Sequence, residues 1–194
     1  MTTMQDNGQR IARQAFQYLN TLVLLKWRMG LGRYINIWPQ GLGRFMVLVH
    51  TGRKTGMQRR TPTNYTAIDG DIYVAAGFGK VSHWYKNIMA NPRIEIWMDN
   101  GWWEAEAEDI TGGPRHTELM REVLKGSGFA AYVAGINPYT MSDEALDTAT
   151  ASYRLLRIRR TTPRTGAGGP DDLVWLWPVL LIGVGLVAMR RKQG

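Results

Sequence analysis

The chain has 194 residues, with 24 Lys and Arg against 16 Asp and Glu, a formal charge of +8, 44% hydrophobic residues and no cysteine. This length suits one domain with attachments, and the composition argues against a disordered chain or a polytopic membrane protein. The lack of cysteine excludes disulfides, Cys-ligated zinc, iron–sulfur clusters and thiolate nucleophiles. Three widely spaced histidines, His50, His83 and His116, predict no metal site.

The charge is unevenly distributed along the chain. Residues 1–60 hold ten basic residues and one acid, residues 61–150 hold six and thirteen, and residues 151–194 hold eight and two, giving +9, −7 and +6. A nucleic-acid binder would instead spread Lys and Arg over one face with aromatic residues between them. We therefore expect no nucleic-acid partner, and an anionic membrane surface or an anionic cofactor explains the basic ends better.

Residues 1–40 are predicted to form an amphipathic helix and a linker. Between Gly8 and Met29, apolar residues recur at helical spacing, and a flank of Arg and Gln, including Arg10 and Arg13, occupies the other side. Such a helix can pack on a domain or lie in a membrane interface. A second membrane signal near the end of the chain favours the interface.

Residues 41–160 are predicted to form the main domain, with an α+β, mainly β fold. Short strands are expected at 44–50, 60–68, 72–76, 93–98, 102–110 and 153–160, and helices at 81–90, 114–125 and 142–150. Asp69-Gly70-Asp71 and Asp99-Asn100-Gly101 are typical of hairpin turns. The helices are too few to cover both faces of a doubly wound sheet, so the pattern predicts a small, mainly antiparallel barrel.

The C-terminal segment is predicted to be a flexible linker, residues 161–172, followed by a transmembrane or membrane-anchoring helix over residues 173–192. Residues 173–189 form an uncharged run that would span about 26 Å as a helix. Three basic residues follow this run: Arg190, Arg191 and Lys192. Trp175 and Trp177 suit the headgroup level. A buried C-terminal helix is the alternative. No signal peptide is visible, so we expect a cell-membrane location with the main domain in the cytoplasm.

Two motifs in the main domain stand out. His50 to Arg60, HTGRKTGMQRR, places two glycines, small hydroxyls and four positive charges where a strand runs into a loop, which suits an anion. A solvated hairpin tip is the alternative. Ser82 to Pro92, SHWYKNIMANP, predicts a short helix rich in aromatics and amides, which could lie beside a planar ring or simply pack in the core.

The order and spacing of these motifs resemble the deazaflavin-dependent nitroreductase family, the split-barrel oxidoreductases that use coenzyme F420. The match runs over about residues 42–135, through GRKTG, DGDIYVAA, HWYKNIMANPRIEI and WWEAEAEDITG. The resemblance implies a split β-barrel, two-electron chemistry and a deazaflavin whose phosphate and oligoglutamate tail is anionic. The sequence departs from the family after Tyr132, and the hydrophobic tail is an addition to the family plan.

The resemblance also implies a set of site residues. Arg53, Lys54 and Arg59 would hold the tail and phosphate of the cofactor, while Pro62 and Asn64 would lie on the strand beside its ring. The full cofactor-binding set is Thr51, Gly52, Arg53, Lys54, Thr55, Gly56, Arg59, Arg60, Pro62, Asn64, Ala76, Gly77, Trp84, Tyr85, Asn87 and Asn91. Trp27, Phe78 and Tyr132 are the candidate substrate contacts, and Tyr65 and Tyr139 the candidate proton donors.

These features lead to a functional hypothesis: a membrane-anchored reductase that passes hydride from reduced F420 to a lipophilic acceptor, such as a quinone. The alternatives are an FMN- or FAD-dependent reductase or a fatty-acyl or lipid reductase on the same barrel, and a non-catalytic flavin- or haem-binding module at the membrane. Membrane lipid is an expected partner, and the resemblance leaves both a homodimer and a monomer open.

Overall fold

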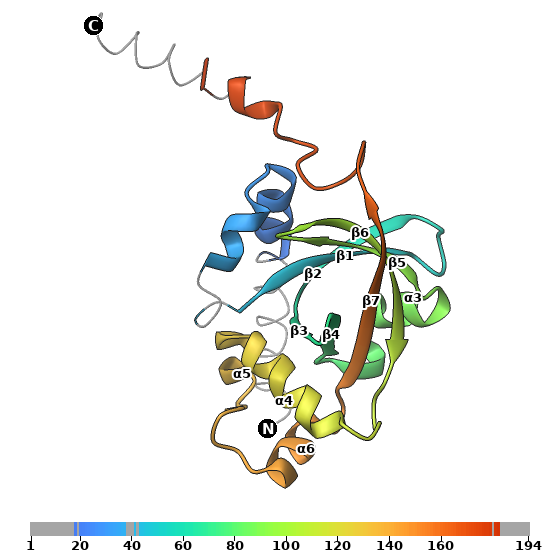
Figure 1. The fold of residues 1–194 in the computed structure, drawn as a ribbon, viewed down its shortest axis with the longest axis vertical. Helices are drawn as coiled ribbons and strands as arrows, with labels where there is room; N and C mark the ends of the chain where they lie inside the picture. Colours follow the sequence, from blue (N-terminus) through green and yellow to red (C-terminus); the bar gives the residue numbers. More distant parts are fainter. Residues whose placement is uncertain (1–17, 19, 38–40, 42, 180, 183–194) are drawn as a thin grey trace, which may run out of the picture.

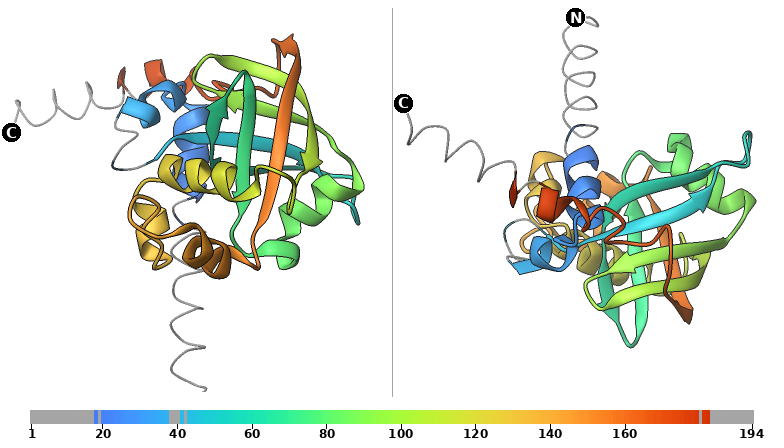
Figure 2. Two further views of the ribbon diagram at one scale, coloured as in Figure 1. Left: turned by 60° about the horizontal axis from the view of Figure 1, so that its bottom comes forward. Right: turned by 90° about the horizontal axis from the view of Figure 1, so that it is seen from above.

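The computed structural model describes residues 18, 20–37, 41, 43–179 and 181–182. Seven strands form one antiparallel sheet in the order β2-β1-β5-β6-β7-β4-β3, which curls into a half-barrel with helices around it (Figures 1 and 2). The strands are β1 (Phe45–Thr51), β2 (Gln58–Asn64), β3 (Thr66–Ile68), β4 (Asp71–Ala76), β5 (Arg93–Met98), β6 (Gly101–Asp109) and β7 (Arg154–Arg164). The prediction of a mainly β fold is confirmed.

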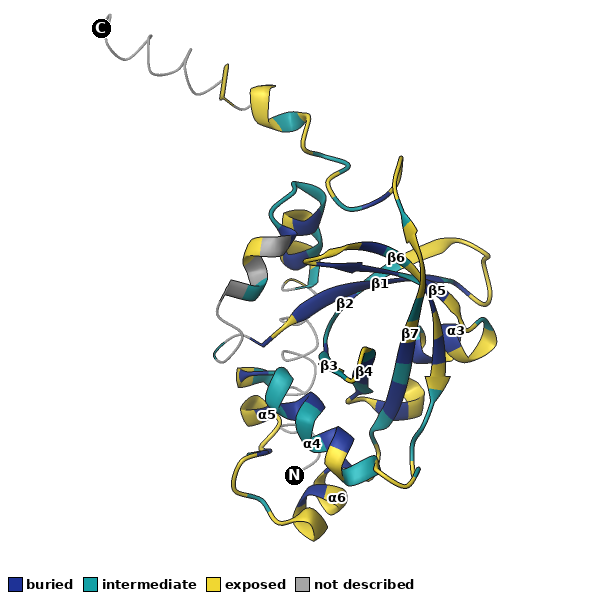
Figure 3. Ribbon diagram, viewed as in Figure 1, coloured by how far each residue is buried: buried dark blue, intermediate teal, exposed yellow. Residues whose placement is uncertain are grey.

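Successive side chains of a strand point to opposite faces of the sheet. Nearly every residue of β1 is buried, so the sheet is covered on both faces at this strand (Figure 3). Met46 and Leu48 point into the barrel, where they pack with residues such as Ile96 and Leu156. Val47 and Val49 point outward, against Val23 and Trp27 of the N-terminal segment. The inner face therefore holds the barrel core, and the outer face of β1 and β5 holds a second one.

The helices cover the ends and the outer face of the sheet. They are α3 (His83–Ala90), α4 (His116–Gly126), α5 (Phe129–Val133) and α6 (Asp143–Thr150), with 3-10 turns η1 (Gly32–Ile37) and η2 (Gly79–Val81). Tyr85 and Ile88 of α3 join the barrel core. Leu119, Met120 and Val123 of α4 pack against Tyr73 and Leu155 on the outer face of β4 and β7. α3 thus lies beside the loop between β1 and β2. The two predicted motifs, residues 50–60 and residues 82–92, are therefore neighbours in the fold.

The two edges of the sheet are β2 and β3, and Tyr65 alone separates them in the sequence. The chain therefore passes directly from one edge of the half-barrel to the other. Asp69 and Gly70 then take positive φ angles in the tight turn between β3 and β4, as a two-residue hairpin loop requires. The predicted strand over residues 60–68 is in this way divided into β2 and β3.

The N-terminal segment packs on the domain where it is described. Residues 20–28 are helical, and Val23 and Trp27, 5% and 2% exposed, lie against the outer face of the barrel. Leu22 and Leu25 on the other side of this helix remain exposed. Of the two alternatives for this segment, residues 20–28 follow the domain-packing one, while residues 8–17 and 19 of the predicted helix lie outside the described residues.

The start of the C-terminal segment caps this N-terminal helix. The backbone N–H groups of Asp171 and Leu173 donate to the carbonyls of Trp27 and Arg28, at 3.1 and 2.8 Å. Arg28 forms a two-pronged ion pair with Asp172 at 2.8 and 2.9 Å. The last carbonyls of a helix have no partner within it, so the returning chain satisfies them.

The prediction of a transmembrane helix over residues 173–192 is wrong for the described part of that segment. No helix among the described residues is long and apolar enough to cross a membrane. The indole N–H of Trp177, predicted at a headgroup level, donates instead to the carbonyl oxygen of Met29 at 3.0 Å. The prediction of a cell-membrane location depended on this transmembrane helix, so that prediction is overturned as well. Residues 180 and 183–192 lie outside the described residues.

The segment before the tail is also more ordered than a flexible linker. β7 continues to Arg164, four residues into the predicted linker. Gly169 lies so close to Trp102 that an added Cβ would stand 2.5 Å from its ring. Residues 154–173 therefore run as a strand and a packed connection to the N-terminal helix.

Candidate functional site

The loop between β1 and β2 is held by its own hydrogen bonds. Gly52 donates its N–H to the carbonyl of Met57 at 2.8 Å and accepts from the N–H groups of Thr55 and Gly56 at 3.1 and 2.8 Å. A Cβ on Gly52 would stand 2.9 Å from the Thr55 hydroxyl oxygen and 3.2 Å from the carbonyl oxygen of Met57, so the turn leaves little room for a side chain at this position. The loop is thus a compact tip whose longer side chains are exposed.

Three cations of the first motif gather at this tip: Arg53 and Lys54 of the loop and Arg59 at the start of β2, which we call the cationic hairpin. All three are exposed. No ion pair between described residues includes any of them. The hairpin therefore presents uncompensated positive charge to solvent, as an anion-binding site requires.

A buried polar connection ties the hairpin to α3. The side-chain oxygen of Asn87 accepts from the backbone N–H of Arg53 at 3.2 Å and from its guanidinium at 2.9 Å. The Asn87 amide nitrogen lies 3.3 Å from Nδ1 of His50, whose Nε2 lies 3.1 Å from the Thr61 hydroxyl. His50 and Asn87 are 3% and 7% exposed. Burial, and then the charge of Arg59, lower the pKa of His50 to about 4.

The register of β1 with β2 decides which predicted residues share this side of the sheet. His50 pairs with Arg59, Leu48 with Thr61 and Met46 with Thr63. Because Met46 and Leu48 point into the barrel, Arg59, Thr61 and Thr63 belong to its inner face. The inner face of edge strand β2 is therefore polar, with one cation and two hydroxyls.

The alternate residues of β2 point outward. Pro62 pairs with Val47, and Asn64 donates to the carbonyl of Arg44 at 3.2 Å. The guanidinium of Arg60 lies 5.2 Å from the centre of the Trp97 ring and donates to the carbonyl of Gly168 at 3.2 Å. The structure thus places Arg60, Pro62 and Asn64 on the face opposite Arg59, although all four were predicted together.

The second motif is placed beside the hairpin, and three of its polar side chains, Tyr85, Asn87 and Asn91, are already hydrogen-bonded. The Tyr85 hydroxyl donates to Asp109 at 2.5 Å, and burial together with this bond raises the pKa of Tyr85 to about 12. Asn91 ends α3, and its side-chain oxygen accepts from the N–H of Arg93 at 3.3 Å. Trp84 is half-buried against the barrel core.

The end of β4 contributes two further predicted residues. Ala76 is 1% exposed in the barrel core, and Gly77 follows it on the surface. A Cβ on Gly77 would stand 3.6 Å from the ring of Tyr153, an ordinary contact distance. Ala76 and Gly77 thus lead from the core to η2 and α3, at the end of the barrel that α3 covers.

The two tyrosines predicted as proton donors lie in different environments. Tyr65 is 2% exposed in the barrel core, where burial, the largest cause, raises its pKa to about 12. Tyr139 is 62% exposed, and the Lys125 ammonium lies 5.7 Å from the centre of its ring. Of the two, only Tyr139 is open to solvent as the structure stands.

The three predicted substrate residues occupy separate parts of the fold. Trp27 is buried on the outer face of β1, in the cluster formed with the N-terminal helix. Phe78 is exposed just before η2, and Tyr132 is exposed on α5. In Figure 1, α5 lies on the other side of the barrel from α3. The structure does not bring these three side chains together.

The sequence analysis did not include His50, Thr61 or Thr63 among the site residues. The available signal was the two-residue alternation of β1 and β2, since each of the three shares its face with Arg59. The Thr61 hydroxyl oxygen lies 3.1 Å from Nε2 of His50, and the tautomer of His50 decides which of the two groups donates. With the ring proton on Nε2, the Thr61 hydroxyl accepts from His50 and can donate its own proton to a ligand on the inner face of β2.

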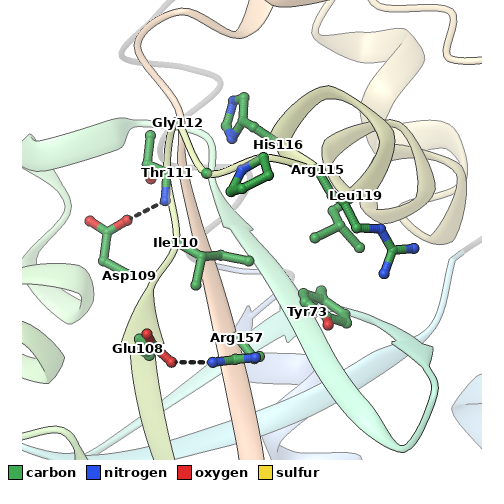
Figure 4. Close-up of a pocket in the computed structure, with 12 residues that line it drawn as sticks. Tyr73, Glu108, Asp109, Ile110, Thr111, Gly112, Arg115, His116, Leu119 and Arg157 are labelled. Carbon is green, nitrogen blue, oxygen red and sulfur yellow. Dashed lines mark hydrogen bonds and ion pairs between the residues drawn. The ribbon is translucent and has the colours of Figure 1, made fainter.

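A hollow of about 540 Å³ lies elsewhere, on the outer face of β4, β6 and β7 next to the start of α4 (Figure 4). Its charged residues are paired: Arg157 with Glu108 at 2.6 Å, and Arg115 with Glu118 at 2.6 Å. None of the predicted site residues lines it. The hollow is therefore separate from the cationic hairpin and α3, where most of the predicted site residues lie.

Several solved structures resemble parts of the chain. A conserved hypothetical protein from Mycobacterium tuberculosis is 20% identical over 65% of this chain and 85% of its own, with a TM-score of 0.43. An F420-H2 dependent reductase is 18% identical over 59% and 92%, with a TM-score of 0.43. The heme storage protein HutZ from Vibrio cholerae is 12% identical over 69% and 89%, with a TM-score of 0.42.

The family comparison is more informative, because it covers most of the barrel. Residues 29–138 match the family model described as F420H(2)-dependent quinone reductase, which is more than half of the chain. The matched range contains the cationic hairpin and α3. The resemblance read from the motifs is confirmed: the chain belongs to the F420H(2)-dependent quinone reductase family and is a reductase that uses coenzyme F420.

Proposed function

We propose that this reductase transfers hydride from reduced F420 to a quinone-type acceptor, with the cationic hairpin holding the anionic part of the cofactor. The observation that carries the proposal is the unpaired charge of Arg53, Lys54 and Arg59. An isolated hairpin tip gains nothing from three adjacent cations, which repel one another. A ligand that carries several negative charges removes that repulsion and explains the arrangement.

The residues around the hairpin fit the rest of such a cofactor. The inner face of β2 adds the hydroxyls of Thr61 and Thr63 next to Arg59, and these can hydrogen-bond a polar ring edge. Trp84, half-buried at the barrel core, offers a flat apolar surface. When bound, F420 supplies the hydride. The protein needs to bind and orient cofactor and acceptor and to limit water between them.

The quinone-type acceptor is proposed from the family to which the chain belongs. A soluble naphthoquinone and a nitroaromatic compound are suitable test acceptors. The first offers a quinone for reduction and the second a nitro group, so the two assays separate a quinone reductase from a nitroreductase. We expect F420H2 to be oxidised by the quinone with the higher kcat/KM. Tight F420 binding without oxidation by either acceptor would instead indicate a binding module.

Cofactor titration tests the role of the cationic hairpin. Lys54→Ala removes an exposed cation, and we expect the Kd for F420 to rise about five- to tenfold. Arg115→Ala is the matched control, because Arg115 is an exposed cation of the outer face. Equal Kd values for Lys54→Ala and the wild type would contradict the proposed role, as would an equal loss in Arg115→Ala.

A further inference from the structure

The connection from Thr61 through His50 and Asn87 to Arg53 joins four parts of the chain. Thr61 lies on β2 and His50 on β1, Asn87 lies on α3, and Arg53 lies in the hairpin loop. Every neighbouring pair is within hydrogen-bond distance, from 2.9 to 3.3 Å. His50 and Asn87, the two inner members, are more than nine-tenths buried. The exposed cation is therefore attached to a buried and fully bonded support.

The direction of each hydrogen bond follows from Arg53. An arginine side chain and a backbone N–H can only donate, so the Asn87 atom that meets both is its oxygen. The Asn87 amide nitrogen then faces His50 and donates to Nδ1. Nδ1 must be unprotonated to accept, which leaves the ring proton on Nε2, where it is donated to the Thr61 hydroxyl oxygen.

The surroundings of His50 keep the ring neutral, as this pattern requires. The charged groups on its side of the sheet are cations, Arg59 opposite it on β2 and Arg53 beyond Asn87. The group that meets it from α3 is the neutral amide of Asn87. Glu95 of β5 pairs with Val49 and so belongs to the other face. Burial, and then the charge of Arg59, lower the pKa of His50.

We propose that Asn87 and His50 are positioning residues for cofactor binding: His50 fixes the amide of Asn87, and Asn87 holds Arg53 in the orientation that receives the anionic cofactor. This inference rests on the proposed function, because it assumes that Arg53 binds F420. Asn87 then acts through Arg53 and not by contact, since both atoms of its amide are already engaged. An arginine held in one orientation loses less freedom on binding a ligand.

A double-mutant cycle on F420 affinity tests this dependence. We expect Arg53→Ala to raise the Kd for F420 at least tenfold and Asn87→Ala about three- to tenfold. The double variant should lose less affinity than the product of the two single losses, because the guanidinium that Asn87 orients is absent and only the bond of Asn87 to the backbone N–H of residue 53 remains to be lost. A double variant whose loss is the product of the two single losses would overturn the inference while leaving the proposed function intact. An unchanged Kd in Arg53→Ala would instead contradict the proposed role of Arg53.

Two replacements of His50 separate positioning from a general structural role. His50→Asn places an amide oxygen where Nδ1 lies and can still accept from Asn87. His50→Gln places an amide nitrogen near Nε2 and can reach only Thr61. We expect His50→Asn to keep the wild-type Kd within about twofold and His50→Gln to weaken binding as Asn87→Ala does. Equal effects of the two replacements would overturn the role assigned to His50.

A measurement on the free protein completes the test, since it does not depend on F420. Nitrogen-15 NMR of the histidine side chains at neutral pH should show His50 with its proton on Nε2 and with no titration down to about pH 5. A protonated Nδ1 on His50 at neutral pH would overturn the inference.

Discussion

Two groups of basic residues in this protein face different surroundings. In the cationic hairpin, Arg53, Lys54 and Arg59 meet no carboxylate among the described residues. On β7, Arg157 bonds to Glu108 at 2.6 Å and Arg164 to Glu95 at 2.5 Å. Both groups come from the basic ends of the sequence, but Arg157 and Arg164 have carboxylate partners and the three cations of the hairpin have none among the described residues.

The difference arises from strand order. β7 lies beside β6, whose exposed positions carry Glu104, Glu106 and Glu108 from the acidic middle of the chain. The antiparallel register then pairs the two sets, for example Glu106 with Arg159. β2 is an edge strand beside apolar β1, so Arg59 has no such partner. A cluster of basic residues in a sequence therefore indicates a binding surface only when the strand order shows that no acidic residues lie opposite it.

The largest expected effect concerns the neutral histidine behind the cationic hairpin. His50 has a folded pKa of about 4, below its ordinary value of about 6.5, so the unfolded chain binds one more proton between these values. The free energy of unfolding is therefore unaffected by protonation of His50 above about pH 6.5. As the pH falls from about 6.5 to about 4, protonation of His50 in the unfolded chain lowers the free energy of unfolding by about 3 kcal/mol.

Urea unfolding of the wild type and His50→Asn between pH 4 and 7 measures this effect. The variant lacks the titrating ring, so its stability should fall less steeply with acid. Identical slopes for the two proteins would show that His50 is not kept neutral in the fold.

The second prediction concerns stability on the paired side. Arg164→Ala removes the bond to Glu95, which is largely buried, and the stacking of Arg164 at 4.8 Å from the centre of the Trp102 ring. We expect a loss of about 1–2 kcal/mol. Lys54→Ala, from the unpaired group, should change the free energy of unfolding by less than about 0.5 kcal/mol. Equal urea midpoints for these two variants would remove the distinction between the groups.

The third prediction concerns salt. Unpaired exposed cations attract an anionic ligand through solvent, so raising the ionic strength from about 0.05 to 0.3 M should weaken F420 binding several-fold. Lys54→Ala should show a shallower dependence, while Arg159→Ala should keep that of the wild type. A fluorescence titration at three salt concentrations provides the slopes, and one common slope would contradict the assignment of the cofactor to the hairpin.

The smallest effect is expected where the C-terminal segment returns to the N-terminal helix. Arg28→Ala removes a partly exposed ion pair with Asp172, and the expected loss is about 0.5–1 kcal/mol. Arg115→Ala removes an exposed pair within one helical turn and should cost less. Urea midpoints compare the two. A larger loss in Arg115→Ala would indicate that the returning segment contributes nothing to the fold.

Most of the sheet could be predicted from the sequence, because strand alternation and turn residues are local signals. The expected strand at 93–98 coincides with β5, and Ser142 caps α6 by accepting from the N–H of Ala145 at 3.3 Å. The five residues of α5 were not predicted, since so short a helix carries no periodic pattern. The sheet order depends on contacts distant in sequence and could not be read from local patterns.

The hydrophobic tail shows a different limit of sequence analysis. Its apolar composition indicated a membrane-spanning or buried helix, whereas Val174, Trp175 and Leu181 are 43%, 64% and 69% exposed in the structure. In the structure, residues 171–177 return to the end of the N-terminal helix, where the carbonyls of Trp27, Arg28 and Met29 lack partners within the helix. A helix end and a segment more than 140 residues away meet only in the folded chain.

The candidate site was predictable in part. The cationic hairpin followed from its residues and from the family resemblance. Arg60 was grouped with Arg59 because the two are adjacent, whereas strand geometry sends adjacent side chains to opposite faces. The support from His50 and Asn87 joins β1 to α3, and no spacing in the sequence shows that contact.

One matched titration tests the central claim, that the unpaired cations hold the anionic cofactor. The double variants Arg53→Ala/Arg59→Ala and Arg157→Ala/Arg159→Ala each remove two positive charges, so they alter the net charge equally. We expect the Kd for F420 to rise about a hundredfold or more in the first and less than threefold in the second. Equal losses in the two variants, or a greater loss in the second, would contradict this account.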